Sequence, residues 1–219
     1  NKQLKMDFCR NFDNSNKFVF WDIGSNIGLY SIYNSIKNPD SISIAFEPST
    51  SNLRILSRNI SLNNLEKKIK IFTNPLTNRE NEFLLMNEEN FTEGGAMNTF
   101  GENFNFEGKP FTSKMKYQLL GTNINYLVKN NILEIPDYIK IDVDGIEHLI
   151  LFGGNMYLKD PKIKSILIEI NENFKDQHSS ILKIMKENNF KFYNKYKAYN
   201  ADKNKKFFLK FNYIFIKKT

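Results

Sequence analysis

Three acidic residues, Asp142, Asp144 and Glu147, lie within six positions directly after a short apolar run. The run, residues 138–141, is typical of a strand that is buried on both faces of a parallel sheet. A carboxylate at the end of such a strand can take the proton of a hydroxyl group while the hydroxyl oxygen attacks a second reactant that is held in line with it. Asp142 and Asp144 are therefore candidate general bases. The simpler interpretation is that Asp142 only contacts a cofactor and that Glu147 caps its own helix.

The same acids are also candidate metal ligands. Asp142 and Asp144, together with Glu169 or Asn171 after the next expected strand, offer the oxygen ligands that Mg²⁺ prefers. A bound Mg²⁺ would orient and acidify a pair of sugar hydroxyls. No ligand spacing in the sequence specifies the metal, so the base and the metal ligand stay open as alternatives.

Two histidines occur in the chain, His148 and His178. His148 follows the acids directly, and an imidazole with its ordinary pKa near ~6.5 is a plausible general base. His178 is expected at the entry to a later helix. Neither histidine ranks above the acids as a catalytic candidate.

A glycine-bearing turn, D-I-G-S-N-I-G at 22–28, follows another apolar run. Gly24 can take a turn conformation that residues with a side chain avoid, Gly28 allows close helix packing, and the free N–H groups at the helix start suit a carboxylate. Asn26 stands where the dinucleotide fingerprint has its second glycine, which counts against NAD. No Lys-Ser or Lys-Thr pair follows, so a phosphate-binding P-loop is excluded.

Glu47 lies nineteen residues beyond Gly28, at the end of the next apolar run. An acidic side chain at this place can accept hydrogen bonds from both ribose hydroxyls of an adenosine. The glycine turn and Glu47 together are more informative than either alone, because many glycine turns bind nothing.

Alternating strands and helices must position these residues. Short apolar runs predict strands, and 3.6-residue periodicity predicts helices between them. This alternation predicts an α/β doubly wound parallel sheet. We expect strands at 18–21, 41–46, 70–72, 138–141, 165–170 and 207–216, and helices at 28–36, 48–65, 147–152 and 179–188.

The middle of the chain is less regular. Strands are expected at 82–86 and 117–120, with a short helix from Thr122 to Asn130. The segment 90–110 between the two strands is rich in Gly, Asn and Phe, and long ordered loops are usually functional. Its part 93–101 is a candidate lid over an acceptor, although an ordinary surface loop has the same composition.

Four segments, DIGSNIGLYS, AFEPS, IKIDVDGIEHLIL and ILIEIN, resemble in this order the FkbM family of S-adenosylmethionine-dependent methyltransferases. The resemblance spans most of the chain. It implies the Rossmann-like class I methyltransferase fold, with a mostly parallel seven-stranded sheet, an antiparallel last strand and helices on both faces. Two positions depart from the family pattern: Ser25 replaces the commoner Ala, and Asp144 replaces Glu.

The resemblance also implies which residues bind S-adenosylmethionine. The first motif would hold the methionine part, Glu47 the ribose, and residues after the second and third strands the adenine. The cofactor-binding set is Asp22, Gly24, Ser25, Asn26, Gly28, Glu47, Pro48, Asn74 and Pro75.

The expected reaction is methyl transfer to a hydroxyl group, since known family members mostly methylate hydroxyls of sugars in antibiotics, glycolipids and surface polysaccharides. The acceptor would be a small molecule or a glycan. Two alternatives are N-methylation of a protein and a noncatalytic binding module in polysaccharide synthesis. An Asn-Pro-Pro-Tyr motif is missing after the fourth strand, which speaks against nucleobase amines.

Composition adds weaker expectations. The net charge of +7 comes from scattered lysines, so we expect no nucleic-acid partner. No apolar run approaches the ~20 residues of a membrane span, which favours the cytoplasm. The lone Cys9 cannot form an internal disulfide. Residues 1–219 suit one domain, and the start at Asn1 fits a piece of a longer chain. The sequence does not indicate an oligomeric state.

Overall fold

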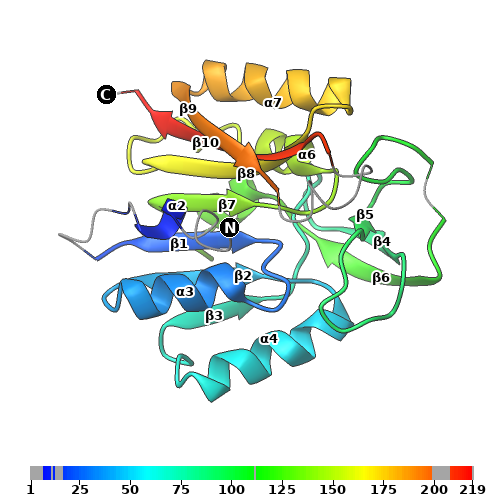
Figure 1. Cartoon of the computed structure of the whole chain (residues 1–219), viewed down its shortest axis with the longest axis horizontal. Coiled ribbons are helices and arrows are strands. Elements are labelled where there is room, and N and C mark those ends of the chain that lie inside the picture. The colour runs from blue at the N-terminus through cyan, green and yellow to red at the C-terminus, as the bar shows by residue number, and fades with distance from the viewer. Residues whose placement is uncertain (1–6, 11, 13–16, 111, 199–207, 219) are drawn as a thin grey trace.

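A computed structural model describes residues 7–10, 12, 17–110, 112–198 and 208–218 (Figure 1). A seven-stranded sheet runs through its centre. The expected α/β fold with a mostly parallel sheet is confirmed. The strands, in their order across this sheet, are β3 (Ile69–Phe72), β2 (Ile42–Phe46), β1 (Val19–Ile23), β7 (Tyr138–Ile141), β8 (Ser165–Asn171), β10 (Lys210–Lys217) and β9 (Phe190–Lys197).

The first five strands in this order are mutually parallel, and β10 is antiparallel to both of its neighbours. The expected antiparallel last strand is therefore confirmed; its expected first residues, 207–209, have no strand structure where they are described. One strand was missed: β9 was not expected from the sequence. It forms the edge of the sheet, where its side chains are mostly exposed.

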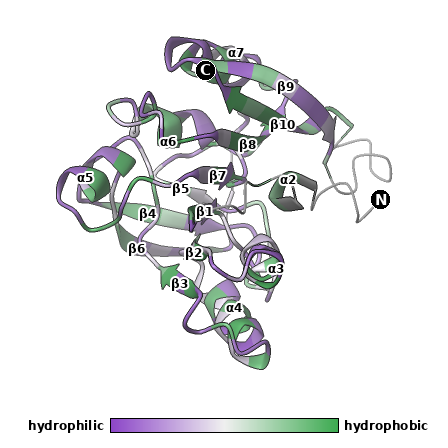
Figure 2. Ribbon diagram, turned by 90° about the vertical axis from the view of Figure 1, so that its left-hand side faces the viewer, coloured by the Kyte–Doolittle hydropathy of each residue, from purple (hydrophilic) through white to green (hydrophobic). Residues whose placement is uncertain are grey.

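Helices cover both faces of the seven-stranded sheet, as expected (Figure 2). Alternate side chains of β1 explain this, because Trp21 packs into the core under one set of helices and Phe20 into the core under the other. One face carries α5 (Ile124–Lys129), α6 (Glu147–Phe152) and α7 (Lys175–Glu187), and the other carries α2 (Asp7–Arg10), α3 (Leu29–Lys37) and α4 (Thr50–Leu62).

A second, antiparallel sheet forms from the middle of the chain. Its strands are β4 (Glu82–Glu88), β5 (Thr99–Phe100) and β6 (Met115–Gly121), with β4 in the centre. Figure 1 shows this small sheet beyond the carboxyl ends of the parallel strands. Two of its strands were expected, whereas β5 lies inside the segment that was expected to be a loop. The small sheet therefore stands where ligands bind in doubly wound folds.

None of the helices in the described ranges has the length and apolar character that a membrane crossing requires.

Candidate active site

The turn between β1 and α3 is held by backbone geometry. Gly24 and Gly28 have φ values of 74° and 87°, in the left-handed region that favours glycine. The N–H groups of Gly24 and Ser25 both donate to the carbonyl oxygen of Phe46, at 3.0 and 2.9 Å. A Cβ atom on Gly24 would lie 1.9 Å from the carbonyl oxygen of Asp142. The turn is thus pressed against the end of β7, and only glycine fits there.

A buried ion pair between Lys140 and Asp22 supports this turn. The Nζ of Lys140 lies 3.2 Å from Oδ1 of Asp22 and donates to the carbonyl oxygen of Gly24 at 2.6 Å. The other oxygen of Asp22 accepts from the N–H and the hydroxyl of Ser31, at 3.0 and 2.7 Å. Asp22 was expected to bind the cofactor; the structure places it beneath the turn, away from the pocket lining. Lys140 was not singled out, although a lysine inside an apolar strand was a visible signal.

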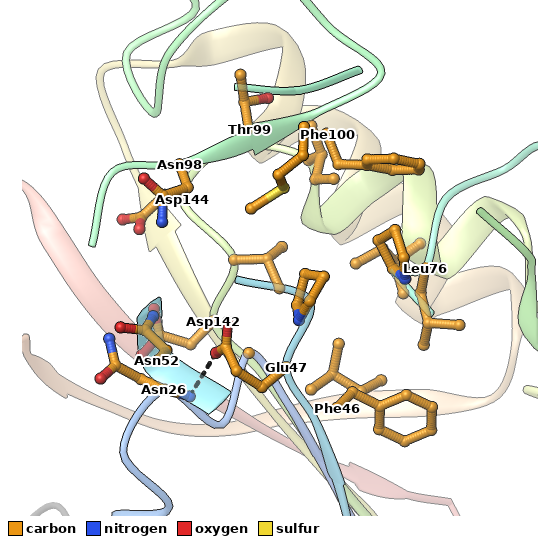
Figure 3. Close-up of a pocket in the computed structure, with 18 of the residues that line it drawn as sticks. Asn26, Phe46, Glu47, Asn52, Leu76, Asn98, Thr99, Phe100, Asp142 and Asp144 are labelled. Atoms are coloured by element: carbon orange, nitrogen blue, oxygen red, sulfur yellow. Dashed lines mark hydrogen bonds between the residues drawn. The ribbon is translucent and has the colours of Figure 1, made fainter. Parts of the chain in front are cut away.

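Glu47 lies at the carboxyl end of β2, beside the turn. Its two carboxylate oxygens accept from the N–H groups of Asn26 and Ser49, at 2.7 and 2.9 Å (Figure 3). Burial raises the pKa of Glu47 to about 7, and these hydrogen bonds act against the rise. The carboxylate is therefore fixed in place, and with about four lone-pair sites it can accept a further hydrogen bond from a ligand.

A pocket with an open volume of about 630 Å³ lies between this turn, the ends of β2 and β7, and the small sheet (Figure 3). This volume includes space that is open to solvent at the pocket mouth. Six of the nine expected cofactor-binding residues line it: Gly24, Asn26, Glu47, Pro48, Asn74 and Pro75. Ser25 and Gly28, like Asp22, do not. The far end is apolar and is lined by Phe46, Leu76, Met86, Phe100, Ile146 and Ile150.

Three buried polar atoms near this pocket lack a hydrogen-bond partner among the described residues. They are Oγ of Ser25, Oδ1 of Asn52 and Oγ1 of Thr99. Asn52 and Thr99 line the pocket, and Ser25 belongs to the turn beside it. Buried polar atoms are nearly always hydrogen-bonded in folded proteins, so these three are suited to a polar ligand.

The segment 93–98 runs along the mouth of the pocket and is tied down at several points. The side-chain amides of Asn26 and Asn52 donate to the carbonyl oxygen of Gly95, at 2.8 and 3.1 Å. On the other side, the N–H of Met97 donates to Oδ2 of Asp144 at 2.6 Å. We call 93–98 the strap. It is the part of the expected lid that joins the turn to the acids.

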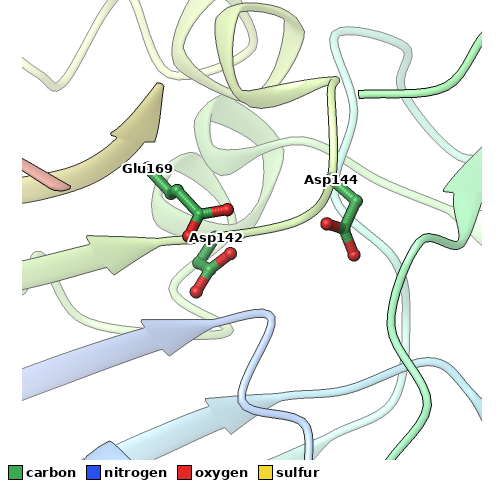
Figure 4. Close-up of side chains that lie close together, drawn as sticks. All are labelled: Asp142, Asp144 and Glu169. Carbon is green, nitrogen blue, oxygen red and sulfur yellow. The ribbon is translucent and has the colours of Figure 1, made fainter. Parts of the chain in front are cut away.

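The three expected metal ligands, Asp142, Asp144 and Glu169, do meet, with one oxygen of each within 4.8 Å of the others (Figure 4). Asp142 and Asp144 also line the pocket. Burial raises the pKa of Glu169 to about 8, and the charge of Asp142 adds to the rise. We call these three residues the acid cluster.

A lysine that was not predicted from the sequence, Lys210, lies against the acid cluster. The Nζ of Lys210 forms an ion pair with Oε2 of Glu169 and lies 3.3 Å from Oδ1 of Asp144. Burial acts to lower the pKa of Lys210, but the attraction of Glu169 and Asp144 outweighs it and raises the pKa above its ordinary value. An ammonium group therefore sits beside the carboxylates that line the pocket.

Glu147 does not reach the pocket. It is buried and accepts hydrogen bonds from the N–H groups of Val143 and Gly145, each at 3.1 Å, and from the side chain of Gln177. Burial raises the pKa of Glu147 to about 7. Its carboxylate ties together the backbone on both sides of Asp144, which itself has a positive φ of 61°. Glu147 thus holds the loop that carries the acids; it was expected to cap its own helix, but α6 has no side-chain cap.

His148 lies outside the pocket lining. Its ring meets that of Phe174 edge-on, with centroids 6.0 Å apart, and burial lowers its pKa. Nδ1 of His148 has no hydrogen-bond partner among the described residues. The structure brings the two aspartates to the pocket and leaves this imidazole away from it.

Solved methyltransferases share this fold. Precorrin-6y C5,15-methyltransferase from Geobacter metallireducens superposes over 100% of this chain and 87% of its own, with a TM-score of 0.56 and 14% identity. An rRNA methylase from Streptococcus thermophilus gives 0.57 and 13%, over 100% and 96% of the two chains. TrmK from M. capricolum, in complex with the cofactor product S-adenosylhomocysteine, gives 0.53 and 16%, over 98% and 68%. The fold is therefore that of class I methyltransferases.

The sequence profile of the methyltransferase FkbM domain matches residues 22–192. The chain belongs to the FkbM methyltransferase family, as its motifs indicated. Methyltransferase sdnD from Sordaria araneosa is 39% identical over 71 residues, a match that covers 32% of this chain and 27% of that protein.

Proposed function

We propose that this chain binds S-adenosylmethionine in the pocket and transfers its methyl group to a hydroxyl group. The observation that carries the proposal is the position of Glu47, a fixed carboxylate between the glycine turn and an apolar pocket end. A ribose has two hydroxyls to donate to such a carboxylate. The unpartnered oxygens of Ser25, Asn52 and Thr99 add further support, because a polar cofactor would satisfy them.

The parts of the cofactor would be distributed along the pocket. The backbone of Gly24 and Asn26 would hold the methionine end, and the apolar end would take the adenine between Pro48 and Asn74-Pro75. In this arrangement Asp22 and Gly28 act from outside the pocket. Asp22 braces the turn through Lys140, and Gly28 lets α3 pack closely on Leu56.

S-adenosylmethionine, held by Gly24, Asn26 and Glu47, would supply an electrophilic methyl group on its sulfonium, which the acceptor oxygen would take with release of the neutral thioether. The protein holds the reactants in line and accepts the hydroxyl proton. We assign the proton to Asp144 or Asp142, which line the pocket. His148 is the third candidate base and would have to turn toward the pocket to serve.

A second role for the acids is to hold Mg²⁺. Asp142, Asp144 and Glu169 would be its ligands, and the ion would orient and acidify the acceptor hydroxyl. Lys210 competes for the same oxygens.

We propose a sugar in a glycan, glycolipid or natural product as the acceptor. The acids and Asn98 give the pocket mouth the hydrogen-bonding groups that a sugar uses. Protein N-methylation and a noncatalytic role in polysaccharide synthesis are the alternatives. A protein that binds the cofactor and methylates no acceptor would favour the noncatalytic role.

Calorimetric titration with S-adenosylmethionine, and separately with NAD, tests the cofactor. We expect micromolar binding of the first and none of the second. Glu47→Ala should weaken binding, whereas Glu66→Ala, at an exposed position, is the matched control. Failure of the folded, ligand-free protein to bind S-adenosylmethionine would refute the proposal. Transfer of a labelled methyl group to glycans, compared with peptides, then tests the acceptor.

A further inference from the structure

The position of Lys210 follows from the direction of β10. This strand is antiparallel to β8, with Lys210 opposite Asn171 and Asn212 opposite Glu169. The first residue of β10 therefore lies at the edge of the sheet where the parallel strands end. An ammonium group from β10 reaches the pocket edge in the same way as the carboxylates that follow β7 and β8.

Lys210 is anchored on several sides. Besides Glu169 and Asp144, its Nζ lies 4.8 Å from the centre of the Phe106 ring, which is itself buried. Only 10% of the Lys210 side chain is exposed. A buried ammonium is stable only where carboxylates compensate it, so its place is set by the acid cluster.

A divalent cation would need the same oxygen atoms. The cluster places one oxygen of each acid within 4.8 Å of the others, and the Lys210 ammonium contacts two of the three carboxylates. Lys140 approaches from the other side, with its Nζ 3.9 Å from Oδ2 of Asp142. Two lysines therefore already provide positive charge where Mg²⁺ would bring more, and like charges at such distances repel.

The lysine is also linked to the strap. Oδ1 of Asp144 faces Lys210, and Oδ2 accepts from the N–H of Met97. Glu169, Lys210, Asp144 and Met97 thus form a chain of contacts from the sheet to the mouth of the pocket. Removal of the ammonium would leave Asp144 free to turn away from the strap.

We propose that Lys210 is the resident cation of the acid cluster: its ammonium group takes the place of a divalent metal and holds Asp144 against the strap. The second half rests on the proposed cofactor pocket. Lys210 is a positioning residue, which acts through Asp144. The enzyme accordingly works without an added metal.

The test begins with Mn²⁺, which prefers the same oxygen ligands as Mg²⁺ and is followed directly by electron paramagnetic resonance. The titration needs neither S-adenosylmethionine nor an acceptor, so its outcome is independent of the proposed reaction. We expect no saturable Mn²⁺ site in the wild-type protein. In Lys210→Met the vacated acids should bind Mn²⁺ at least about tenfold more tightly than the wild type, and Asp144→Asn on that background should remove the gain.

Two further variants separate charge from size. Lys210→Arg keeps a cation and should bind Mn²⁺ no better than the wild type. Lys191→Met removes an exposed lysine from β9 and should change nothing. For S-adenosylmethionine, Lys210→Met should bind about fivefold more weakly because the strap is loosened, and Lys210→Arg should restore binding.

Three results would overturn the inference. A saturable Mn²⁺ site in the wild-type protein that Asp144→Asn abolishes would show that the metal binds despite Lys210, and this measurement stands even where Lys210→Met fails to fold. A folded Lys210→Met that gains no Mn²⁺ affinity would show that the acids do not form a cation site. Methyl transfer by the wild-type protein that stops in EDTA and returns with Mg²⁺ would contradict metal independence.

Discussion

Two buried lysines, Lys140 and Lys210, stand at the same edge of the main sheet and have different surroundings. Lys140 is 3% exposed; its Nζ lies 3.2 Å from the fully buried Asp22 and 3.9 Å from Asp142, and it donates to the backbone of the glycine turn. Lys210 is 10% exposed and contacts two carboxylates, one of which lines the pocket. Lys140 thus fixes the backbone of the glycine turn, whereas Lys210 fixes the carboxylates of Asp144 and Glu169 beside the pocket.

A buried charge can stabilise the fold or serve a ligand site. Around Lys140, Asp22 is satisfied by Ser31 as well, so its carboxylate is committed to the fold. At the acid cluster, three acids outnumber the two nearby ammonium groups, those of Lys210 and Lys140, and Asp142 remains 29% exposed. Surplus negative charge beside a pocket is suited to proton transfer. The comparison predicts that loss of Lys140 affects stability, whereas loss of the acids near Lys210 affects turnover.

The largest effect is expected for Lys140→Met. It leaves the carboxylate of Asp22 buried without its cation, which typically costs about 3–5 kcal/mol of unfolding free energy. Urea unfolding measures the loss. Lys162→Met is the control, because Lys162 pairs with Glu134 at the surface, where such pairs contribute about 0–1 kcal/mol. Equal losses in the two variants would contradict the structural role of Lys140.

Asp144→Asn tests the other side of the comparison. Loss of a general base typically lowers turnover about 10²–10⁴-fold. The affinity for S-adenosylmethionine should change far less, because the amide keeps an oxygen for Met97. Single-turnover methyl transfer and calorimetry separate the two effects, with the exposed Asp40→Asn as control. Unchanged turnover would remove Asp144 from the mechanism and leave Asp142.

A smaller effect concerns pH and Glu47. Its pKa of about 7 means that the carboxylate becomes ionised as pH rises through neutrality, so S-adenosylmethionine should bind more tightly above about pH 7 than below it. Calorimetry across this range measures the trend, which Glu47→Gln should flatten. A wild-type affinity that is flat, or that falls with pH, would argue against a ribose contact.

The same pKa has an opposite effect on stability. Glu47 has a pKa of 4.5 when unperturbed, so the folded state binds more protons than the unfolded state between 4.5 and about 7. Stability contributed by Glu47 therefore falls as pH rises through this window. Glu147 and Glu169 shift in the same direction, so the contribution is read from the difference between the wild type and Glu47→Gln.

The smallest effect is expected at the strap. Asn26→Ala removes the good side-chain hydrogen bond to Gly95, at 2.8 Å, and a longer one to Gly94, at 3.3 Å, but keeps the backbone N–H that donates to Glu47. One hydrogen bond is worth about 1 kcal/mol, so cofactor affinity should fall about fivefold. Asn59→Ala is the matched control, because it loses an exposed hydrogen bond from the side-chain amide to the carbonyl oxygen of Ile27. A loss near a hundredfold would mean that the Asn26 side chain contacts the cofactor itself.

Local signals explain which parts of the site the sequence could predict. The glycine turn and Glu47 follow apolar strands at a fixed spacing, so their places could be inferred. Ser25 and Gly28 share the motif with Gly24, yet spacing alone could not tell which residues face the pocket. Residues distant in sequence determine which side of the motif faces the pocket, because Gly24 packs against Asp142 and Gly28 against Leu56.

The two lysines and β9 escaped prediction for another reason. Lys210 was counted only among the scattered lysines that give the chain its net charge, and the pairing of β10 with β8 is what brings it to the acids. Strand β9 lies at the edge of the sheet, where most of its side chains are exposed. Its sequence therefore lacks the regular alternation of apolar and polar residues that predicts a strand. The separate small sheet could not be foreseen, because its pairing of β4 with β6 joins segments about 30 residues apart.

The place of β10 also matters for biosynthesis. It follows all the other described strands in the chain, yet it lies between β8 and β9 in the sheet. A nascent chain that has emerged only as far as β9 therefore lacks the strand that joins β9 to β8. Such a chain would already carry every residue that lines the pocket, while its acid cluster would still lack the ammonium group of Lys210.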